Sequence, residues 1–246
     1  MKWIALSFGF LILLLTGPIA VAVGDEANVS GDWRLVTRES SGQAPSPDTT
    51  PEAVVQVYGA RAFRWRGAFA VHTWISVKPE NATEYTTYEV VGWRAFHGGQ
   101  AVQVHNDGPD RHWYGARPEL YADLRGEKAV EAIGKIKTAV AAYPYPDFYR
   151  TWPGPNSNTF VAFVTKSVPE LVVDLPPTAI GKDFLSNGSV IGTPPSGEGL
   201  QLSLFGILGV IVSPQEGLEF NILGLSFGID PAELALRLPG IGKVGP

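Results

Sequence analysis

Three polar side chains in otherwise apolar surroundings could carry chemistry in this sequence. Ser157 stands in the run NSNTF, which follows a Pro- and Gly-rich loop and opens a predicted helix. His72 and Glu89 each interrupt an apolar, strand-like run, where a buried imidazole or carboxylate needs a partner. Adjacent antiparallel strands could bring Glu89 beside His72. If all three converge, they supply the nucleophile, the base and the orienting carboxylate of a hydrolase.

The start of this helix could also stabilise a negatively charged oxygen. Backbone N–H groups in a first helical turn are unpaired, and the helix dipole is positive there. An oxyanion formed at Ser157 would then lie near the N–H groups supported by Asn156 and Asn158. The alternative is structural: Asn156 or Ser157 caps the helix, and His72 is a core histidine with a satisfied hydrogen bond.

Four aromatic side chains are candidates for lining a substrate cleft. Their faces suit a sugar or a peptide, although aromatic residues in loops are just as often packing residues. The four are Trp74, Trp113, Tyr114 and Trp152.

A polar stretch of histidines and aspartates could be interpreted as a metal site. It contains His97, His105, His112, Asp107 and Asp110. Their spacing fits no compact ligand motif. We therefore predict loop residues and no metal.

Composition excludes several other classes of function. The chain has no cysteine, so a thiol nucleophile, a disulfide and Cys-ligated zinc are ruled out. With a net charge of -5 and 19 Lys and Arg residues in 246, nucleic acid is not an expected partner. No phosphate-binding loop or dinucleotide fingerprint is present, and we expect no cofactor. Lys182 and Asp183 could form a functional pair, or a solvated turn.

The N-terminus has the pattern of a segment that directs export. Lys2 is followed by an apolar stretch from Trp3 to Val23, about the ~20 residues that span a bilayer. The small-x-small run AVA at residues 20–22 suits signal peptidase, so a cleaved signal peptide and a retained anchor are both open. Lys2 inside, with Asp25 and Glu26 outside, predicts that the chain lies on the periplasmic side of a bacterial inner membrane.

The next segments predict a tether followed by strands. Residues 24–51 are rich in Ser, Pro, Gly, Thr and Asp, with one aromatic stretch at 32–35, and are expected to form a linker that partly packs on the domain. Apolar and β-branched runs then alternate with turn sequences, which predicts an antiparallel meander. The predicted strands are 54–58, 69–77, 86–93 and 101–105.

Two helices are expected after the strands. Apolar residues recur every three or four positions over 126–140, the period of an amphipathic helix. Residues 157–166 form the second helix. An antiparallel sheet packed on helices gives an α+β fold for a domain over residues 52–185.

Residues 186–246 are predicted to be a Gly-rich β extension of the same domain. They contain two apolar stretches, 200–212 and 218–227, joined by the turn sequence SPQEG. Each is too short to cross a bilayer as a helix. A curved hairpin covering the core is one interpretation, and a flap resting on a membrane is the other.

Three features follow one another in the chain: a histidine on a strand, a polar residue on the next strand and the helix start NSNTF. This order resembles that found in the permuted papain-like hydrolases and acyltransferases. These include lecithin retinol acyltransferase and relatives of the NlpC-type cell-wall peptidases. The match covers about residues 72–164 and implies a permuted papain-like fold. Those enzymes have cysteine where this chain has Ser157. The runs AFAVHTW, WPGPNSNTF and AIGKD also resemble a bacterial family of unknown function, which implies no activity.

Serine in place of cysteine leaves two functions open. A hydroxyl must lose its proton to a base during attack, whereas a thiol beside imidazole is already partly ionised. The first function is amide or ester hydrolysis, or acyl transfer, by Ser157, His72 and Glu89 on a cell-envelope small molecule, peptide or lipid. The second is an inactive envelope binding or structural module.

Overall fold

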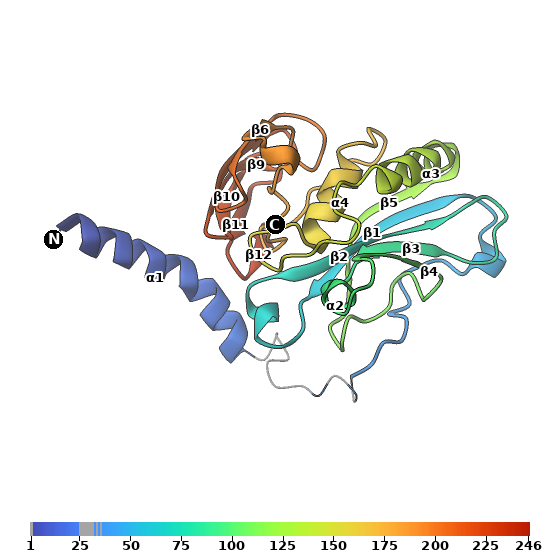
Figure 1. The fold of residues 1–246 in the computed structure, drawn as a ribbon, viewed down its shortest axis with the longest axis horizontal. Helices are drawn as coiled ribbons and strands as arrows, with labels where there is room; N and C mark the ends of the chain where they lie inside the picture. The colour runs from blue at the N-terminus through green and yellow to red at the C-terminus, as the bar shows by residue number, and fades with distance from the viewer. Residues whose placement is uncertain (1, 25–31, 33, 35) are drawn as a thin grey trace.

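The computed structural model describes residues 2–24, 32, 34 and 36–246, which form two antiparallel sheets, several helices and a projecting N-terminal helix (Figure 1). The predicted acidic flank at Asp25 and Glu26 lies outside the described residues. Two of the aromatic stretch's residues, Trp33 and Leu35, lie outside them as well. The coarse α+β prediction is confirmed.

The first sheet has five strands in the order β4-β3-β2-β1-β5. Its first four strands confirm the predicted antiparallel meander. The fifth was not predicted, because the charged residues of this half-exposed edge strand resemble a polar loop. The strands are β1 (Val54–Arg61), β2 (Val71–Lys78), β3 (Thr86–Val90), β4 (Val102–His105) and β5 (Glu119–Arg125).

The predicted strand over 86–93 is too long, since β3 ends at Val90 and the short helix α2 (Gly92–Phe96) follows. Gly92 packs on Tyr149 so closely that an added Cβ would lie 2.4 Å from the ring. Three short 3₁₀ helices lie elsewhere: η1 (Pro47–Thr49), η2 (Arg64–Ala68) and η3 (Ser186–Gly188).

Helices α3 (Gly126–Ala141) and α4 (Ser157–Thr165) cover one face of the five-stranded sheet, and both confirm the predicted helices. The buried residues of α3 recur at helical spacing, so they form one stripe facing the sheet. The main hydrophobic core lies between these layers and includes Val57, Ile75, Ile136, Phe160 and Val164.

Loops cover the opposite face of the same sheet. Every residue of β2 is buried, so neither face of this strand is open to solvent. Asp110 fixes part of the predicted linker over this face: it accepts hydrogen bonds from the Ser40 hydroxyl (2.8 Å) and the Gln43 N–H (2.6 Å).

The second sheet has seven strands in chain order, so each predicted strand of the C-terminal hairpin is in fact a hairpin of its own. The missed turns are Phe205-Gly206 and Leu223-Gly224, which have positive φ at both residues. Asn or Asp usually precedes Gly there, so the apolar residues conceal the turns. The strands are β6 (Ile191–Gly192), β7 (Leu200–Leu204), β8 (Leu208–Ser213), β9 (Gly217–Ile222), β10 (Leu225–Asp230), β11 (Ala235–Leu238) and β12 (Gly242–Val244).

A buried network of charges joins the second sheet to the segment that follows α4. Glu219 on β9 binds the Lys182 ammonium (2.9 Å) and the Arg237 guanidinium (2.6 Å). Arg237 also forms a two-pronged pair with Asp174, at 2.8 and 2.7 Å. Asp174 and Lys182 precede the second sheet in the chain, so these ion pairs fix its inner face on the first domain. We call this set the Glu219 network.

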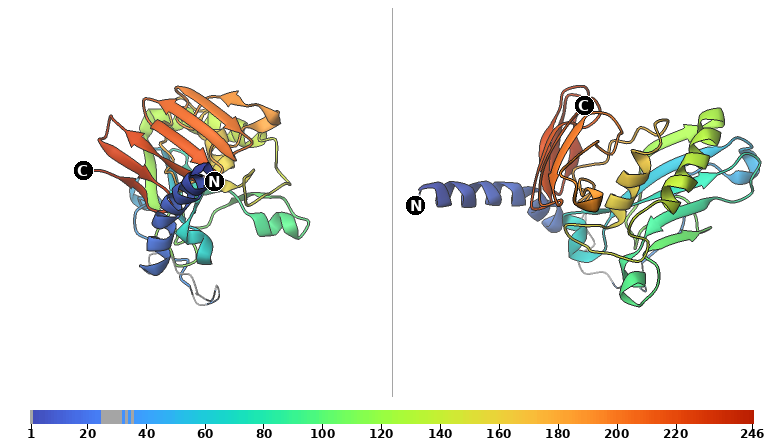
Figure 2. Two further views of the ribbon diagram at one scale, coloured as in Figure 1. Left: turned by 90° about the vertical axis from the view of Figure 1, so that its left-hand side faces the viewer. Right: turned by 45° about the horizontal axis from the view of Figure 1, so that its top comes forward.

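Helix α1 (Lys2–Val23) is long and apolar enough to span a membrane, with its most apolar window at Leu6–Val23. A stripe of buried positions in its second half, 14, 17, 18 and 21, packs on the domain, where Val21 meets Ala68 of η2. The first half projects from the side of the second sheet that faces away from the five-stranded sheet (Figure 2).

Loss of the Arg237 charge should destabilise the fold strongly. We expect Arg237→Met to lower the free energy of unfolding by about 3 kcal/mol, because Asp174 and Glu219 lose a buried partner. The control Lys135→Met removes an ammonium that pairs with Glu170 at the surface and should change stability far less. Denaturant unfolding in mild detergent measures both. Equal effects would show that the Glu219 network does not hold the sheet.

Candidate functional site

Glu89 is the centre of a buried polar cluster on the loop-covered face of the five-stranded sheet. Its carboxylate binds His72 Nε2 (2.7 Å), His105 Nε2 (2.8 Å) and Arg111 Nη2 (2.7 Å). The sheet register produces this geometry, because Glu89 pairs with Trp74 across β2 and β3 and His72 lies two residues along the same face. The expected pairing of His72 with Glu89 is therefore found, and we call the four polar residues the Glu89 cluster.

The charges of the cluster are set by burial and hydrogen bonding. Burial alone would raise the pKa of Glu89, but hydrogen bonds from His105 and His72 and the nearby Arg111 charge hold it well below its usual range. Burial lowers the pKa of His72, which Glu89 only partly offsets. A neutral His72 thus donates its Nε2–H to an ionised Glu89, whose two oxygens already accept three donors.

Aromatic rings complete the cluster. The His72 ring stacks on Trp113, with centroids 3.7 Å apart and planes 13° apart. The Arg111 guanidinium lies 5.5 Å from the Trp74 ring centroid and 5.7 Å from that of Trp113, within the range of a cation–π contact. Tyr114 packs edge-on against Trp113. Three of the four cleft candidates therefore pack around the Glu89 cluster.

The fourth cleft candidate, Trp152, lies elsewhere. Its indole N–H donates to the Leu223 carbonyl at 3.0 Å, in the turn between β9 and β10. Trp152 therefore links the loop before α4 to the second sheet and does not line a common cleft with Trp113.

The structure does not bring Ser157 to His72, so the expected catalytic triad is not formed. Neighbouring strand residues point to opposite faces of a sheet. Thr73, next to His72 on β2, faces α4 and donates to the Asn158 side chain at 2.9 Å. His72 faces the other way, onto Trp113. The sheet itself separates Ser157 from the Glu89 cluster.

The N–H groups near Asn158 that were expected to bind an oxyanion at the start of α4 are already hydrogen-bonded. The Asn156 side-chain oxygen accepts the N–H of Asn158 (2.9 Å) and of Thr159 (3.2 Å). Thr159 in turn accepts the Asn156 N–H at 3.1 Å, which completes a capping box. The structural alternative, a cap at Asn156 or Ser157, is confirmed with Asn156 as the cap, and these two N–H groups have no free capacity for a reacting oxygen.

Asn156 has a further structural task at this corner. Its side-chain amide donates to the carbonyls of Thr151 (3.0 Å) and Ile180 (2.9 Å). Gly181, at φ +94°, approaches so closely that an added Cβ would lie 2.5 Å from the Asn156 amide nitrogen. We call residues 156–159 (NSNT) the NSNT corner. It joins β2, α4 and the loop around residue 180, and Ser157 is buried within it.

The histidines and aspartates considered as a possible metal site are not gathered in one place. His97 binds the Trp93 carbonyl and His112 binds the Glu39 carbonyl, whereas His105 belongs to the Glu89 cluster. Within residues 2–24, 32, 34 and 36–246 no three His, Asp or Glu side chains are grouped to hold a metal ion. Asp110 holds the linker.

Lys182 and Asp183 do not form a solvated turn. Both are buried. Lys182 binds Glu219, while Asp183 accepts a hydrogen bond from Asn221 at 2.5 Å. Burial raises the pKa of Asp183.

Sequence reasoning missed the roles of Arg111, Glu219 and Arg237. Arg111 stands in a polar loop, and nothing local shows that it reaches Glu89. The sequence does indicate that Glu219 and Arg237 lie on strands, because each alternates with apolar residues in a short run, GLEFNI and ALRL. That alternation identifies two faces of a strand, but it does not say that the polar face is the buried one.

Comparison with known proteins identifies the family. The model of a family described as a protein of unknown function (DUF3750) matches residues 52–184, more than half of the chain, and the chain belongs to this family. No curated protein and no solved structure matches. The resemblance to permuted papain-like hydrolases thus gains no support, whereas the resemblance to a family of unknown function is confirmed.

Stability should fall on acidification in a way that depends on His72. Its pKa in the folded state lies below the ordinary 6.5, so below pH 6.5 the unfolded chain binds a proton that the folded chain does not. His72→Gln keeps a donor for Glu89 without titrating. We expect the thermal midpoint of the wild type to fall between pH 6.5 and 5, and that of the variant to fall less.

A second loss should appear below pH 4.5 in both proteins. The stabilisation from ionised Glu89 is present above its ordinary pKa of 4.5 and is lost as the pH falls below it. The control for the His72 prediction is His97→Gln, at an exposed histidine. It should keep the wild-type dependence of the thermal midpoint on pH. Parallel profiles for His72→Gln and wild type would contradict the assigned neutral His72.

The corner at α4 should depend on Asn156 and not on Ser157. We expect Asn156→Ala to lower the free energy of unfolding by about 2 kcal/mol, because the cap and two part-buried hydrogen bonds are lost. Ser157→Ala should cost less than about 1 kcal/mol. Denaturant unfolding of the two variants compares them directly. A larger loss for Ser157→Ala would contradict the assigned cap.

Proposed function

We propose that this DUF3750 protein is an exported, membrane-anchored module of the bacterial envelope that binds an envelope component or has a structural role, and is not a serine hydrolase. The observation that carries the proposal is the separation of Ser157 from His72 by the five-stranded sheet, inferred from Thr73 contacting Asn158 and His72 stacking on Trp113. A nucleophile without a base within reach is not activated.

The electrostatics of the Glu89 cluster support a structural role for it. A base must exchange protons with a substrate at a pKa near the working pH. Glu89 is buried, ionised and bound by three donors, and His72 is shielded by Trp113. The cluster instead ties three strands to the covering loop through Arg111.

Location outside the inner membrane is supported by the N-terminal helix. Lys2 is the first residue of an apolar helix long enough to span a membrane, and positive charge tends to remain on the cytoplasmic side. Residues after Val23 then lie on the periplasmic side, where a cysteine-free chain is unaffected by the oxidising environment.

Reaction with a serine-directed probe tests the absence of catalysis. A fluorophosphonate added to the full chain should give no label above that of Ser157→Ala, because Ser157 has neither a base nor a free oxyanion site. An active serine hydrolase labelled in parallel shows that the probe works. Labelling that disappears only in Ser157→Ala would overturn the proposal.

Single-cysteine labelling tests the location. The chain has no cysteine, so Val130→Cys, on an exposed position of α3, gives one reactive site. We expect a membrane-impermeant maleimide to label it in cells with an opened outer membrane and an intact inner membrane. Wild type is the background control. Labelling only after the inner membrane is lysed would place the domain in the cytoplasm.

A further inference from the structure

We infer that the outward face of the seven-stranded sheet lies on the surface of the lipid bilayer that α1 enters. This inference rests on the proposed membrane anchoring and adds a second contact with the same membrane. We call this surface the outward face, meaning the side of β6–β12 that faces away from the five-stranded sheet.

The outward face is apolar along the paired strands. Strand β7 reads LQLSL, and its three leucines are exposed while Gln201 and Ser203 are buried. The register places the other outward residues beside them, so that Leu202 pairs with Val210, and Val210 with Phe220. The face includes Ile191, Leu200, Leu202, Leu204, Leu208, Val210, Val212, Phe220, Ile229 and Leu236. Soluble proteins rarely leave so large an apolar surface uncovered.

The polar side chains Glu219, Arg237 and Asn221 of this sheet already have partners on its inner side. Glu219 and Arg237 belong to the Glu219 network. Asn221, which borders a hollow of about 540 Å³ in the outward face, donates to Asp183 and to the Gly206 carbonyl. Sites for soluble small molecules use a few convergent polar groups to orient the ligand. The two polar side chains that border this hollow, Ser203 and Asn221, both bond within the protein, which favours lipid as the occupant.

Helix α1 and the outward face are continuous. The Phe10 ring meets the Phe227 ring edge-on, with centroids 5.6 Å apart, and Phe227 stacks on Phe220 of the outward face at 5.6 Å. The helix leaves the domain on the side to which this face points (Figure 2). A membrane entered by α1 is therefore the surface that faces the sheet.

The length of the free part of α1 brings the sheet to the membrane. Phe10 already packs on the sheet, so the free part is residues 2–9, which is about 12 Å long at 1.5 Å per residue. The hydrocarbon core is about 30 Å thick. In this arrangement α1 enters the hydrocarbon only if the outward face comes down to the lipid surface.

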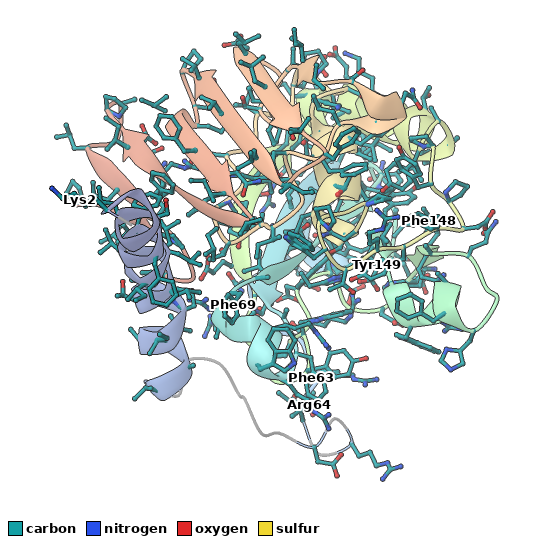
Figure 3. The ribbon with its side chains drawn as sticks, turned by 60° about the vertical axis from the view of Figure 1, so that its left-hand side comes forward. Lys2, Phe63, Arg64, Phe69, Phe148 and Tyr149 are labelled. Carbon is teal, nitrogen blue, oxygen red and sulfur yellow. The ribbon has the colours of Figure 1, made fainter. Side chains whose placement is uncertain are left out.

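Residues suited to the lipid–water interface lie beside the second half of α1. Helix η2 contacts α1 and exposes Arg64, Trp65 and Arg66. Figure 3 shows Arg64 and Phe63 at the end of the domain near the end of α1 that is opposite Lys2. Trp is enriched at membrane interfaces, and Arg is attracted to anionic headgroups.

The seven-stranded sheet lies on the surface of the bilayer and does not enter its hydrocarbon core. It is open, with β6 and β12 as its edges, and unpaired edge N–H and C=O groups are not tolerated in hydrocarbon. Lying flat leaves these edges in the hydrated headgroup region while the leucines contact acyl chains.

Nitroxide labels on single cysteines test the inference in the full chain, reconstituted in nanodiscs that contain anionic lipid. Leu202→Cys and Leu236→Cys report on the outward face. Val130→Cys on α3 has similar exposure, 50% against 44% and 51%, and is the matched control. Phe8→Cys reports on α1. We expect the ratio of oxygen to nickel-chelate accessibility at residues 202 and 236 to be several-fold higher than at 130, and closer to that at residue 8.

Three other outcomes would overturn the inference, each for a different reason. If labels at 202 and 236 are as water-accessible as the label at 130 while the label at 8 is in lipid, the anchor stands and the sheet contact fails. If labels at 202 and 236 are shielded from both reagents and couple between chains, a second copy covers the face. A water-accessible label at residue 8 would instead show that the anchoring itself fails.

Discussion

The burial of the Glu219 network is the constraint on which the rest of this structure depends. Charges in a protein interior are costly unless each has a partner, and here Glu219, Arg237, Asp174 and Lys182 satisfy one another. Because Asp174 and Lys182 lie within the segment matched by the family model and their partners lie beyond it, the network decides how the C-terminal sheet docks. Its charged side must face inward.

That orientation has a direct consequence for the other side of the sheet. Side chains alternate along a strand, so turning Glu219 and Arg237 inward turns Phe220 and Leu236 outward. In most soluble sheets with one covered face the alternation runs the opposite way. The inverted sheet adjoins the apolar α1 through Phe10 and Phe227. The polar network and the exposed leucines are therefore two results of one register, and the membrane contact we propose gives the second a physical role.

The same alternation governs the five-stranded sheet. His72 and Thr73 are neighbours on β2, yet one belongs to the Glu89 cluster and the other to the corner capped by Asn156. Both sites are buried and rich in hydrogen bonds, and together they tie β2 to the covering loop on one side and to α4 on the other. Polar residues that resemble a dispersed catalytic set are thus two separate structural junctions on opposite sides of one strand.

The sequence by itself determined the local elements, because their signals are local. The period of residues 126–140, a cap at Asn156 or Ser157, the β-branched runs of the first four strands and the apolar N-terminal helix all follow from residue types and spacing. It also showed that Glu89 could lie beside His72, since neighbouring strands of a meander pair, but the register that brings them together comes from the structure. Only the tertiary structure decided which face of each strand is buried, that Arg111 and His105 reach Glu89, and that Ser157 lies across the sheet from His72. Alternation along a strand defines two faces, but what packs on each is set by segments far away in the chain.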